Sequence, residues 1–371
     1  MNQFDVVEKI PAQRLTQAIF SPTMEPELML KRAGIIRKEW YATYFNWGRN
    51  ALYALFKRLP YTTIHFPAFT CPVLTDAALA AGKKVELLEV ELETYNLKIG
   101  NLPNKDLECL VVVHTFGNPV DIGQIRKRHP KTFIIEDCAH AIFSEVGGKY
   151  VGHQGDAILF SLYKQVPNLN GALLLTKERF QLKQETESLI SFWPRVIFKT
   201  EGWHHLVINF LRHRYIDTLE ERAYRDSIQP HPLVKGVFVE GFKQLEKEIA
   251  ARRQIACWYR EELKNHPYLV AQKEAKYGES SYYQLVIRLK PDVAHLRDQV
   301  VRSLRQRNIF LDRLWYSAPI TEKRFTHYQL SCPQALQLAR SVMSLPVNSR
   351  MTQREVVTLV RLLTQEIKIN L

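Results

Sequence analysis

Hydrophobic residues in the first half of the chain fall into short runs rich in Val, Ile, Leu and Phe, which is the pattern of buried strands. Between the runs lie longer stretches, such as residues 73–82 and 121–129, that are long enough for helices. The expected strands are residues 61–66, 84–90, 109–114, 132–137 and 157–162. Because strands that alternate with helices pair in parallel and are covered on both faces, the pattern predicts an α/β fold with a mostly parallel sheet.

The second half of the chain has a different pattern. A charged helix is expected at about residues 238–264, followed by the strand-like YYQLVIRL, a helix in LRDQVVRSLRQRN and a last helix after Thr352, a good N-cap residue. This order predicts a large α/β domain in residues 1–235 and a smaller C-terminal α+β domain in residues 236–371. The charged helix is expected to link them.

Residues 185–235 are predicted to be a helical insertion or linker. Their central stretch, 188–225, mixes aromatic side chains with Arg, Lys and His. The favoured interpretation is a pair of helices that packs over the domain or over a dimer interface, because amphipathic aromatic helices usually belong to a core. The alternatives are contact with an anionic membrane surface, where a lipid-linked glycan could be found, and a wall of a phosphosugar pocket.

Composition narrows the class of protein. The chain has 371 residues, of which 46% are hydrophobic and 24% charged, so it is long enough for two folded domains and unlike disordered or fibrous proteins. Its five cysteines are odd in number and lack paired CxxC spacing, so neither a disulfide framework nor a metal site is expected. No signal peptide or membrane span is apparent, and we expect a cytoplasmic protein.

The formal net charge of +13 is consistent with several kinds of anionic partner. The basic residues are spread along the chain without long blocks of like charge, and neither a zinc-finger spacing nor an RNA-recognition sequence is visible. We therefore expect an anionic metabolite as ligand and no nucleic acid.

Three polar residues stand at the ends of two neighbouring expected strands. Asp137 ends one strand, and Ser161 and Lys164 follow the next. Side chains at the carboxyl ends of such strands face the ligand crevice, so these three could meet around one molecule. A carboxylate, a hydroxyl and an amine together suit pyridoxal 5'-phosphate. Taken singly, Asp137 could instead cap a helix and Lys164 could be a solvated surface residue.

Several longer motifs occur in a fixed order. They are GRNALYALF (48–56), PAFTCPVLTDAALAAGKKVELLEV (67–90), VVHTFGNPVDIGQI (112–125), IIEDCAHA (134–141), GDAILFSLYK (155–164) and CPQALQLARSVMSLPVNSRMTQREV (332–356). Together they resemble the DegT/DnrJ/EryC1/StrS aminotransferases, over nearly all of the chain except roughly residues 185–235. The resemblance implies a fold-type I, pyridoxal-phosphate-dependent transferase, similar to aspartate aminotransferase, with a seven-stranded-type sheet and a homodimeric assembly.

The resemblance also implies roles for individual residues. Lys164 would be the Schiff-base lysine and would move a proton between substrate and cofactor. Asp137 would pair with the pyridinium nitrogen, and His140 would lie against the cofactor and bond its ring oxygen. For His140, a helix-borne histidine with partners elsewhere is the alternative. Ser161 would bind the cofactor phosphate.

The other half of the phosphate site is expected at the start of the first long helix. Gly48, Arg49 and Asn50 would bind the phosphate there through backbone amides, although an ordinary helix start would look the same. Many relatives have serine, glycine and threonine at this point, where this chain has Trp47, Gly48 and Arg49. The phosphate contact is therefore expected to be ionic and made by Arg49.

Other departures from the family pattern concern the cofactor and the substrate. Cys71 stands where relatives often place the ring that stacks on the cofactor. Lys164 follows Ser161 by three positions instead of the more usual five, which we interpret as a subgroup feature. Tyr316 resembles a family tyrosine near the substrate, whereas Thr321 replaces a common histidine.

The resemblance implies an enzyme that converts a nucleotide-linked keto sugar to an amino sugar, with glutamate as amino donor, for surface polysaccharide or natural-product synthesis. One alternative is a sugar dehydrase or a non-catalytic binding protein of the same family, although the dehydrase branch has histidine where this chain has Lys164. A more remote alternative is a serine acyl hydrolase, because Ser161 and Lys164 also form an SxxK pair.

Overall fold

The computed structural model describes residues 9–20, 25–180, 182, 184–200, 224–225 and 228–371. Its main feature is a seven-stranded sheet with the order β1-β9-β8-β5-β4-β2-β3. The strands are β1 (Tyr41–Phe45), β2 (Thr63–Pro67), β3 (Lys84–Leu88), β4 (Cys109–Val113), β5 (Phe133–Asp137), β8 (Ala157–Ser161) and β9 (Ala172–Thr176). The five strands expected from the sequence are all present, with ends that shift by two residues at most.

The pairing confirms the mostly parallel sheet. Strands β3, β2, β4, β5 and β8 pair in parallel, whereas β9 pairs antiparallel with both β8 and β1. Neither β1 nor β9 was predicted. An antiparallel β9 needs no crossover helix, so it returns directly from β8 through the short segment that carries Lys164.

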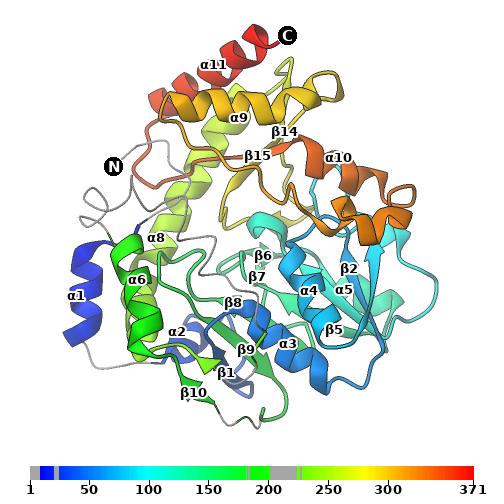
Figure 1. The fold of residues 1–371 in the computed structure, drawn as a ribbon, viewed down its shortest axis with the longest axis vertical. Coiled ribbons are helices and arrows are strands. Elements are labelled where there is room, and N and C mark those ends of the chain that lie inside the picture. Colours follow the sequence, from blue (N-terminus) through cyan, green and yellow to red (C-terminus); the bar gives the residue numbers. More distant parts are fainter. Residues whose placement is uncertain (1–8, 21–24, 181, 183, 201–223, 226–227) are drawn as a thin grey trace.

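Helices cover both faces of this sheet (Figure 1). Alternate residues of β8 join different cores: Leu159 packs with α3 (Gly48–Arg58) and α4 (Pro72–Ala80), while Ile158 and Phe160 pack with the long helix α8 (Pro232–Glu262). This burial on both faces explains why the strands are continuous apolar runs. The other α-helices described in the N-terminal part are α1 (Ala12–Phe20), α2 (Pro26–Arg32), α5 (Ile122–Arg128) and α6 (Leu189–Lys199).

The helix α8 (Pro232–Glu262) joins this part to the C-terminal part. Figure 1 shows α8 running from the side of α1 toward α11 (Gln353–Ile369), and it contacts both helices. Three antiparallel strands, in the order β12-β14-β15, form the C-terminal sheet. The elements of this part are β12 (Leu269–Ala271), β14 (Leu285–Leu289), α9 (Arg297–Gln306), α10 (Pro333–Ser341), β15 (Val342–Leu345) and α11 (Gln353–Ile369).

The three helices expected in the C-terminal part are confirmed, and Thr352 is the N-cap of α11 in a capping box with Glu355. The C-terminal core draws its residues from the second half of α8 onward, from Ile255 to Ile367. The first half of α8 packs against the large sheet instead, so the helix belongs to both cores. The domain boundary at residue 235 stays a prediction.

The segment rich in aromatic and basic residues is described only in part. Within α6, Phe192 is fully buried and packs with Val234 and Val237 of α8, so this helix packs onto the fold, while the expected pair of helices stays a prediction. Residues 201–223, which hold most of the remaining aromatic and basic side chains, lie outside the described residues. Among the residues that the structure describes, no helix combines the length and the apolar character needed to cross a bilayer.

The turn between β8 and β9 closes at Gly171, which has a φ of +105°. Its N–H donates to the carbonyl of Asn46 at 2.8 Å, and its own carbonyl accepts from the N–H of Leu162 at 3.0 Å. A Cβ at this position would lie 2.9 Å from Cγ1 of Val234. Only glycine meets both the backbone and the space requirement here.

We predict that Gly171→Ala lowers the free energy of unfolding by about 1–3 kcal/mol, because the new methyl group forces strain on the backbone and on Val234. Urea unfolding measures this loss. Gly100→Ala is the matched control, because Gly100 has no positive φ and no atom lies within 4 Å of the place that its new methyl group would take. An equal loss in both variants would contradict the local explanation.

Candidate active site

A cavity opens where β4, β5 and β8 end and α3 begins. It contains about 900 Å³ of empty space, part of it open to solvent, which suits a cofactor-sized ligand. Its lining includes seven of the residues singled out in the sequence: Gly48, Arg49, Cys71, Asp137, His140, Ser161 and Lys164. The geometry thus brings together the carboxylate, the hydroxyl and the amine that the strand pattern placed at one sheet edge.

Lys164 points its amine at His140, with 2.8 Å between Nζ and Nε2. Burial, and then the neighbouring Lys164 amine, lower the pKa of His140 well below its usual value, so the ring is neutral near pH 7. If the amine donates to Nε2, the ring proton resides on Nδ1. That Nδ1 is buried and has no hydrogen-bond partner among the described residues.

Asp137 ends β5 opposite Val113 of β4 and Leu159 of β8. Its carboxylate accepts a hydrogen bond from the backbone N–H of Ala139 at 2.9 Å. Burial raises the pKa of Asp137, although the Lys164 amine and that N–H oppose the shift. A carboxylate in this setting gains from a cationic ligand group, because the ligand charge would offset the cost of burying the anion.

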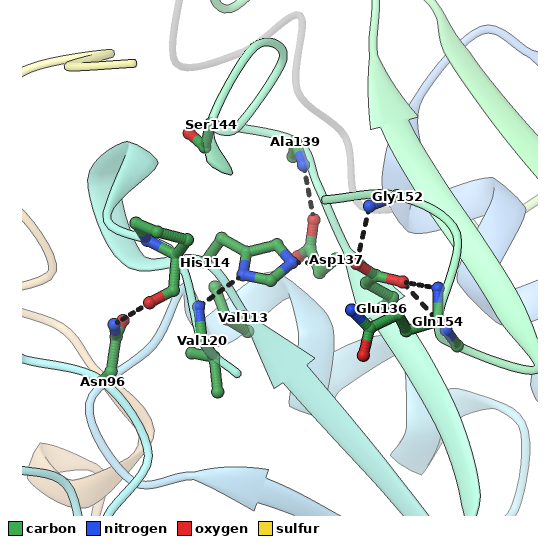
Figure 2. A network of polar contacts seen from close by, with 12 residues as sticks. Asn96, Val113, His114, Val120, Glu136, Asp137, Ala139, Ser144, Gly152 and Gln154 are labelled. Carbon is green, nitrogen blue, oxygen red and sulfur yellow. Dashed lines mark hydrogen bonds and ion pairs between the residues drawn. The ribbon is translucent and has the colours of Figure 1, made fainter. Parts of the chain in front are cut away.

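Glu136 directly precedes Asp137, and the alternation of a strand turns its side chain to the opposite side (Figure 2). Its carboxylate accepts from the backbone N–H groups of Gly152 at 2.6 Å, Gln154 at 2.9 Å and Gly155 at 2.8 Å, and lies 3.2 Å from Nε2 of His114. These bonds fasten the 152–155 loop to the end of β5. Glu136 therefore holds the backbone that carries Asp137.

His114, Glu136 and Cys138 place one potential ligand atom each within 4.8 Å of one another. Nδ1 of His114 accepts from the N–H of Val120 at 2.9 Å, so Nε2 carries the ring proton and donates to Glu136. Burial, then the nearby carboxylates, raise the pKa of the Cys138 thiol well above its usual value, so it stays protonated. The group is a hydrogen-bond network, with no histidine lone pair left for a metal.

Ser161 is the last residue of β8 and lines the same cavity as the first residues of α3. Its hydroxyl is buried and has no hydrogen-bond partner within the described part of the chain. Trp47 and Tyr163 meet edge to face beside it, with ring centroids 5.4 Å apart, and the Arg49 guanidinium lies 5.3 Å from the Trp47 ring. A cation and an unpaired hydroxyl at a helix N-terminus suit an anionic group.

Cys71 is half-buried at the start of α4 and lines the same cavity. Burial raises the pKa of its thiol, despite the opposing charge of Lys164, so the thiol is protonated near pH 7. It offers the cavity a small apolar contact.

Two residues from the sequence prediction lie elsewhere. The Asn50 side chain is buried and donates to Oδ1 of Asn46 at 2.8 Å, and its backbone N–H donates to Trp47, so it is absent from the described cavity lining. Tyr316 is 51% exposed and carries the Arg313 guanidinium 4.4 Å from its ring. Its neighbour Trp315 lines the cavity instead. The substrate role of Tyr316 stays a prediction.

Sequence reasoning also missed the residues that hold the Lys164 turn. Gln165 is fully buried, donates to the carbonyl of Ile142 at 3.2 Å and accepts from the Ile142 N–H. Asn168 donates to the carbonyls of Leu162 at 3.0 Å and Val234 at 2.9 Å. The amide side chains of Gln165 and Asn168, close to Lys164 in the turn sequence KQVPNLNG, were the available signal, since buried amides must find partners.

Comparison with known proteins agrees with the fold. The model of the DegT/DnrJ/EryC1/StrS aminotransferase family matches residues 47–179 and 236–364. The chain is 25% identical over 323 residues to a UDP-N-acetyl-3-dehydro-α-D-glucosamine 3-aminotransferase of Acidithiobacillus ferrooxidans, covering 83% of this chain and 79% of the relative.

Two solved structures share the whole architecture. The aminotransferase TlmJ of Streptoalloteichus hindustanus superposes with a TM-score of 0.73 at 18% identity, covering 98% of this chain and 99% of that one. The E. coli GDP-4-keto-6-deoxy-D-mannose-3-dehydratase, solved with bound hydrated pyridoxal phosphate, gives 0.69 at 18% identity, with 94% and 91% covered.

The fold is that of the fold-type I, pyridoxal-phosphate-dependent enzymes, as the sequence predicted. The chain belongs to the DegT/DnrJ/EryC1/StrS aminotransferase family.

We predict that Glu136→Gln lowers the free energy of unfolding by about 3 kcal/mol at neutral pH, because the amide places donors against donors in a buried network. Urea unfolding of the cofactor-free protein measures the loss. Glu93→Gln is the control: Glu93 is 63% exposed and pairs with Lys273 at the surface, so we expect a change below about 1 kcal/mol.

The pH dependence of this loss tests its cause. Burial alone would raise the pKa of Glu136, but the His114 bond and the backbone N–H groups outweigh it and lower the pKa from 4.5 to about 2. The stabilisation by the carboxylate is therefore complete above pH 4.5 and lost as the pH falls toward 2. The difference between wild type and Glu136→Gln should shrink over that range, and a constant difference would contradict this explanation.

Proposed function

We propose that this chain is a pyridoxal-phosphate-dependent aminotransferase that replaces the keto group of a nucleotide-linked sugar with an amine, taken from an amino acid such as glutamate. The observation that carries the proposal is the meeting of Asp137, Ser161 and Lys164 around one cavity. Family membership and a relative named as a UDP-sugar aminotransferase support it.

The residues present fit the cofactor. Buried polar atoms are nearly always paired, yet Oγ of Ser161 and Nδ1 of His140 have no partner among the described residues. Both line the cavity, so a polar ligand would satisfy them. Ser161 and Arg49 suit the phosphate, Asp137 the ring nitrogen, Lys164 the aldehyde and His140 the ring oxygen.

When bound, pyridoxal phosphate supplies an electron-accepting ring that stabilises the negative charge left at a substrate carbon as its proton departs. The protein supplies the groups around that ring. The Asp137 carboxylate would hold a proton on the ring nitrogen, and the Lys164 amine would carry the proton to or from the substrate carbon. His140, being neutral and 2.8 Å from Lys164, can orient the amine without adding a second positive charge.

Lys164 also separates this proposal from its nearest alternative. Aminotransferases and a dehydratase share the fold almost equally, so the fold does not distinguish them. The family resemblance implies histidine at this position in the dehydrase branch, whereas here the amine lies in the cavity. Transamination is therefore favoured. The resemblance also favours a homodimer with its sites at the subunit boundary, and we propose that the enzyme acts in the cytoplasm.

The serine hydrolase alternative lacks support from the site geometry. Catalysis by a Ser–Lys pair needs the amine to accept the hydroxyl proton. Here the Lys164 amine is bonded to His140, and Oγ of Ser161 has no hydrogen-bond partner within the described residues.

We predict that Lys164→Ala abolishes covalent attachment of pyridoxal phosphate and lowers transamination by at least about a thousandfold, because no other group of the site replaces the amine. Borohydride reduction followed by peptide mass spectrometry locates the attached cofactor. Lys177→Ala is the control, since Lys177 is 64% exposed and pairs with Asp156 outside the cavity. A wild-type protein that takes up no pyridoxal phosphate would refute the proposed function.

We predict that Ser161→Ala weakens binding of pyridoxal phosphate about tenfold, because one hydrogen bond to a charged phosphate is lost. Binding of pyridoxal, which lacks the phosphate, should change little. Equilibrium dialysis of the cofactor-free protein gives both dissociation constants, with Ser331→Ala, a surface serine, as control. Equal weakening toward both ligands would place Ser161 away from the phosphate.

A further inference from the structure

Aromatic side chains stand at two ends of the cavity. Among the described lining residues, Trp47 and Tyr163 pack against each other at the α3 end, beside Arg49. Phe160 is fully buried and packs into the core on the other face of the sheet. This leaves Trp315, a half-buried residue, as the ring at the end near His140.

The turn that carries Trp315 forces this residue into the cavity. Trp315 has a φ of +50°, an unfavourable backbone conformation for a bulky side chain. The turn is held by bonds from the N–H of Tyr316 to the carbonyl of Arg313 at 3.2 Å and from the N–H of Ala318 to the carbonyl of Trp315 at 2.8 Å. Tyr316 faces solvent, whereas Trp315 faces the cavity. The strained backbone of Trp315 is retained in the fold, which points to a function for its indole ring.

The indole has a rigid backing. Its ring centroid lies 4.4 Å from that of Phe116 and 5.2 Å from that of Phe69, and both phenylalanines are almost fully buried. The indole is also nearly parallel to the His140 ring, at 24° and 5.8 Å between centroids. Since His140 contacts the Lys164 amine, the indole lies one ring away from the group expected to react.

The wall beside the indole offers little flat surface. Cys71, Val73 and Leu74 line the cavity there with a thiol and branched aliphatic groups. A planar heteroaromatic ligand packs best against another ring, because offset stacking adds to the gain from buried area. Trp315 and Cys71 line the same cavity and pack against the same hydrophobic core, and Phe69, which contacts Trp315, is only two residues before Cys71.

We propose that Trp315 is the aromatic wall that packs against the pyridine ring of the cofactor and compensates for the missing ring at position 71. This proposal rests on the proposed function. It makes Trp315 a cofactor-binding residue contributed by the C-terminal part of the chain to a site otherwise built on the large sheet. Retention of the cofactor then depends on the 313–318 turn.

Dissociation constants of pyridoxal phosphate from the cofactor-free full chain test the proposal. We expect Trp315→Ala to weaken binding about tenfold and Trp315→Phe to weaken it less than about threefold, because phenylalanine keeps a ring. The double variant Cys71→Tyr/Trp315→Ala should recover most of the loss, because the new tyrosine supplies a ring from the neighbouring wall. Such recovery is a coupling that independent sites do not show.

Trp193→Ala is the control and should leave the dissociation constant unchanged, because Trp193 is 57% exposed on α6 and is not among the described lining residues of the cavity. Thermal unfolding of each cofactor-free variant shows whether it is folded. If Trp315→Ala does not fold, Trp315→Leu and Trp315→Phe are compared instead, because the two new side chains are similar in size and only phenylalanine keeps a ring. Equal affinities of these two variants for pyridoxal phosphate would overturn the proposal. Wild-type affinity in a folded Trp315→Ala would overturn it alone, whereas a wild-type protein that does not bind pyridoxal phosphate would overturn the proposed function as well.

Discussion

The buried carboxylate of Glu136 is the interaction on which the candidate site depends. It is almost fully buried at the end of the central strand β5, and its two oxygens are used by three backbone N–H groups and by His114 (Figure 2). A buried charge is tolerated only when its hydrogen bonds are complete, so this network fixes both the loop and the strand end. The backbone of Asp137, the next residue, is therefore held in place, and its carboxylate lines the cavity.

Two adjacent carboxylates thus serve opposite purposes because a strand turns successive side chains to opposite faces. Hydrogen bonds keep Glu136 ionised, whereas burial raises the pKa of Asp137 and makes its anion favourable mainly beside a cation. The neighbouring strand β8 shows the same division between a side chain that supports the fold and a side chain that lines the cavity. There Phe160 packs into the core and Ser161, the next residue, places at the cavity a hydroxyl that has no hydrogen-bond partner in the described part of the chain.

The sequence predicted the features that depend on local pattern. Apolar runs located five strands, and their ends brought Asp137, Ser161 and Lys164 to one edge. Features set by long-range contacts were missed, such as the antiparallel β9 and the pairing of β1. Trp315 was missed in favour of Tyr316, because a single backbone angle decides which of the two neighbours turns inward, and no periodicity encodes that angle.

The 31-residue helix α8 is the element shared by both halves of the molecule. In its first half, Gly241 packs so closely against Val166 that a methyl group would not fit, and further along Arg252 donates to the carbonyl of Gln165 at 3.2 Å. The helix therefore touches the lysine turn directly while its far end lies in the C-terminal core. The helix α8 therefore couples the C-terminal core to the segment that carries Lys164. A change that loosens that core also weakens the packing that supports the Lys164 amine.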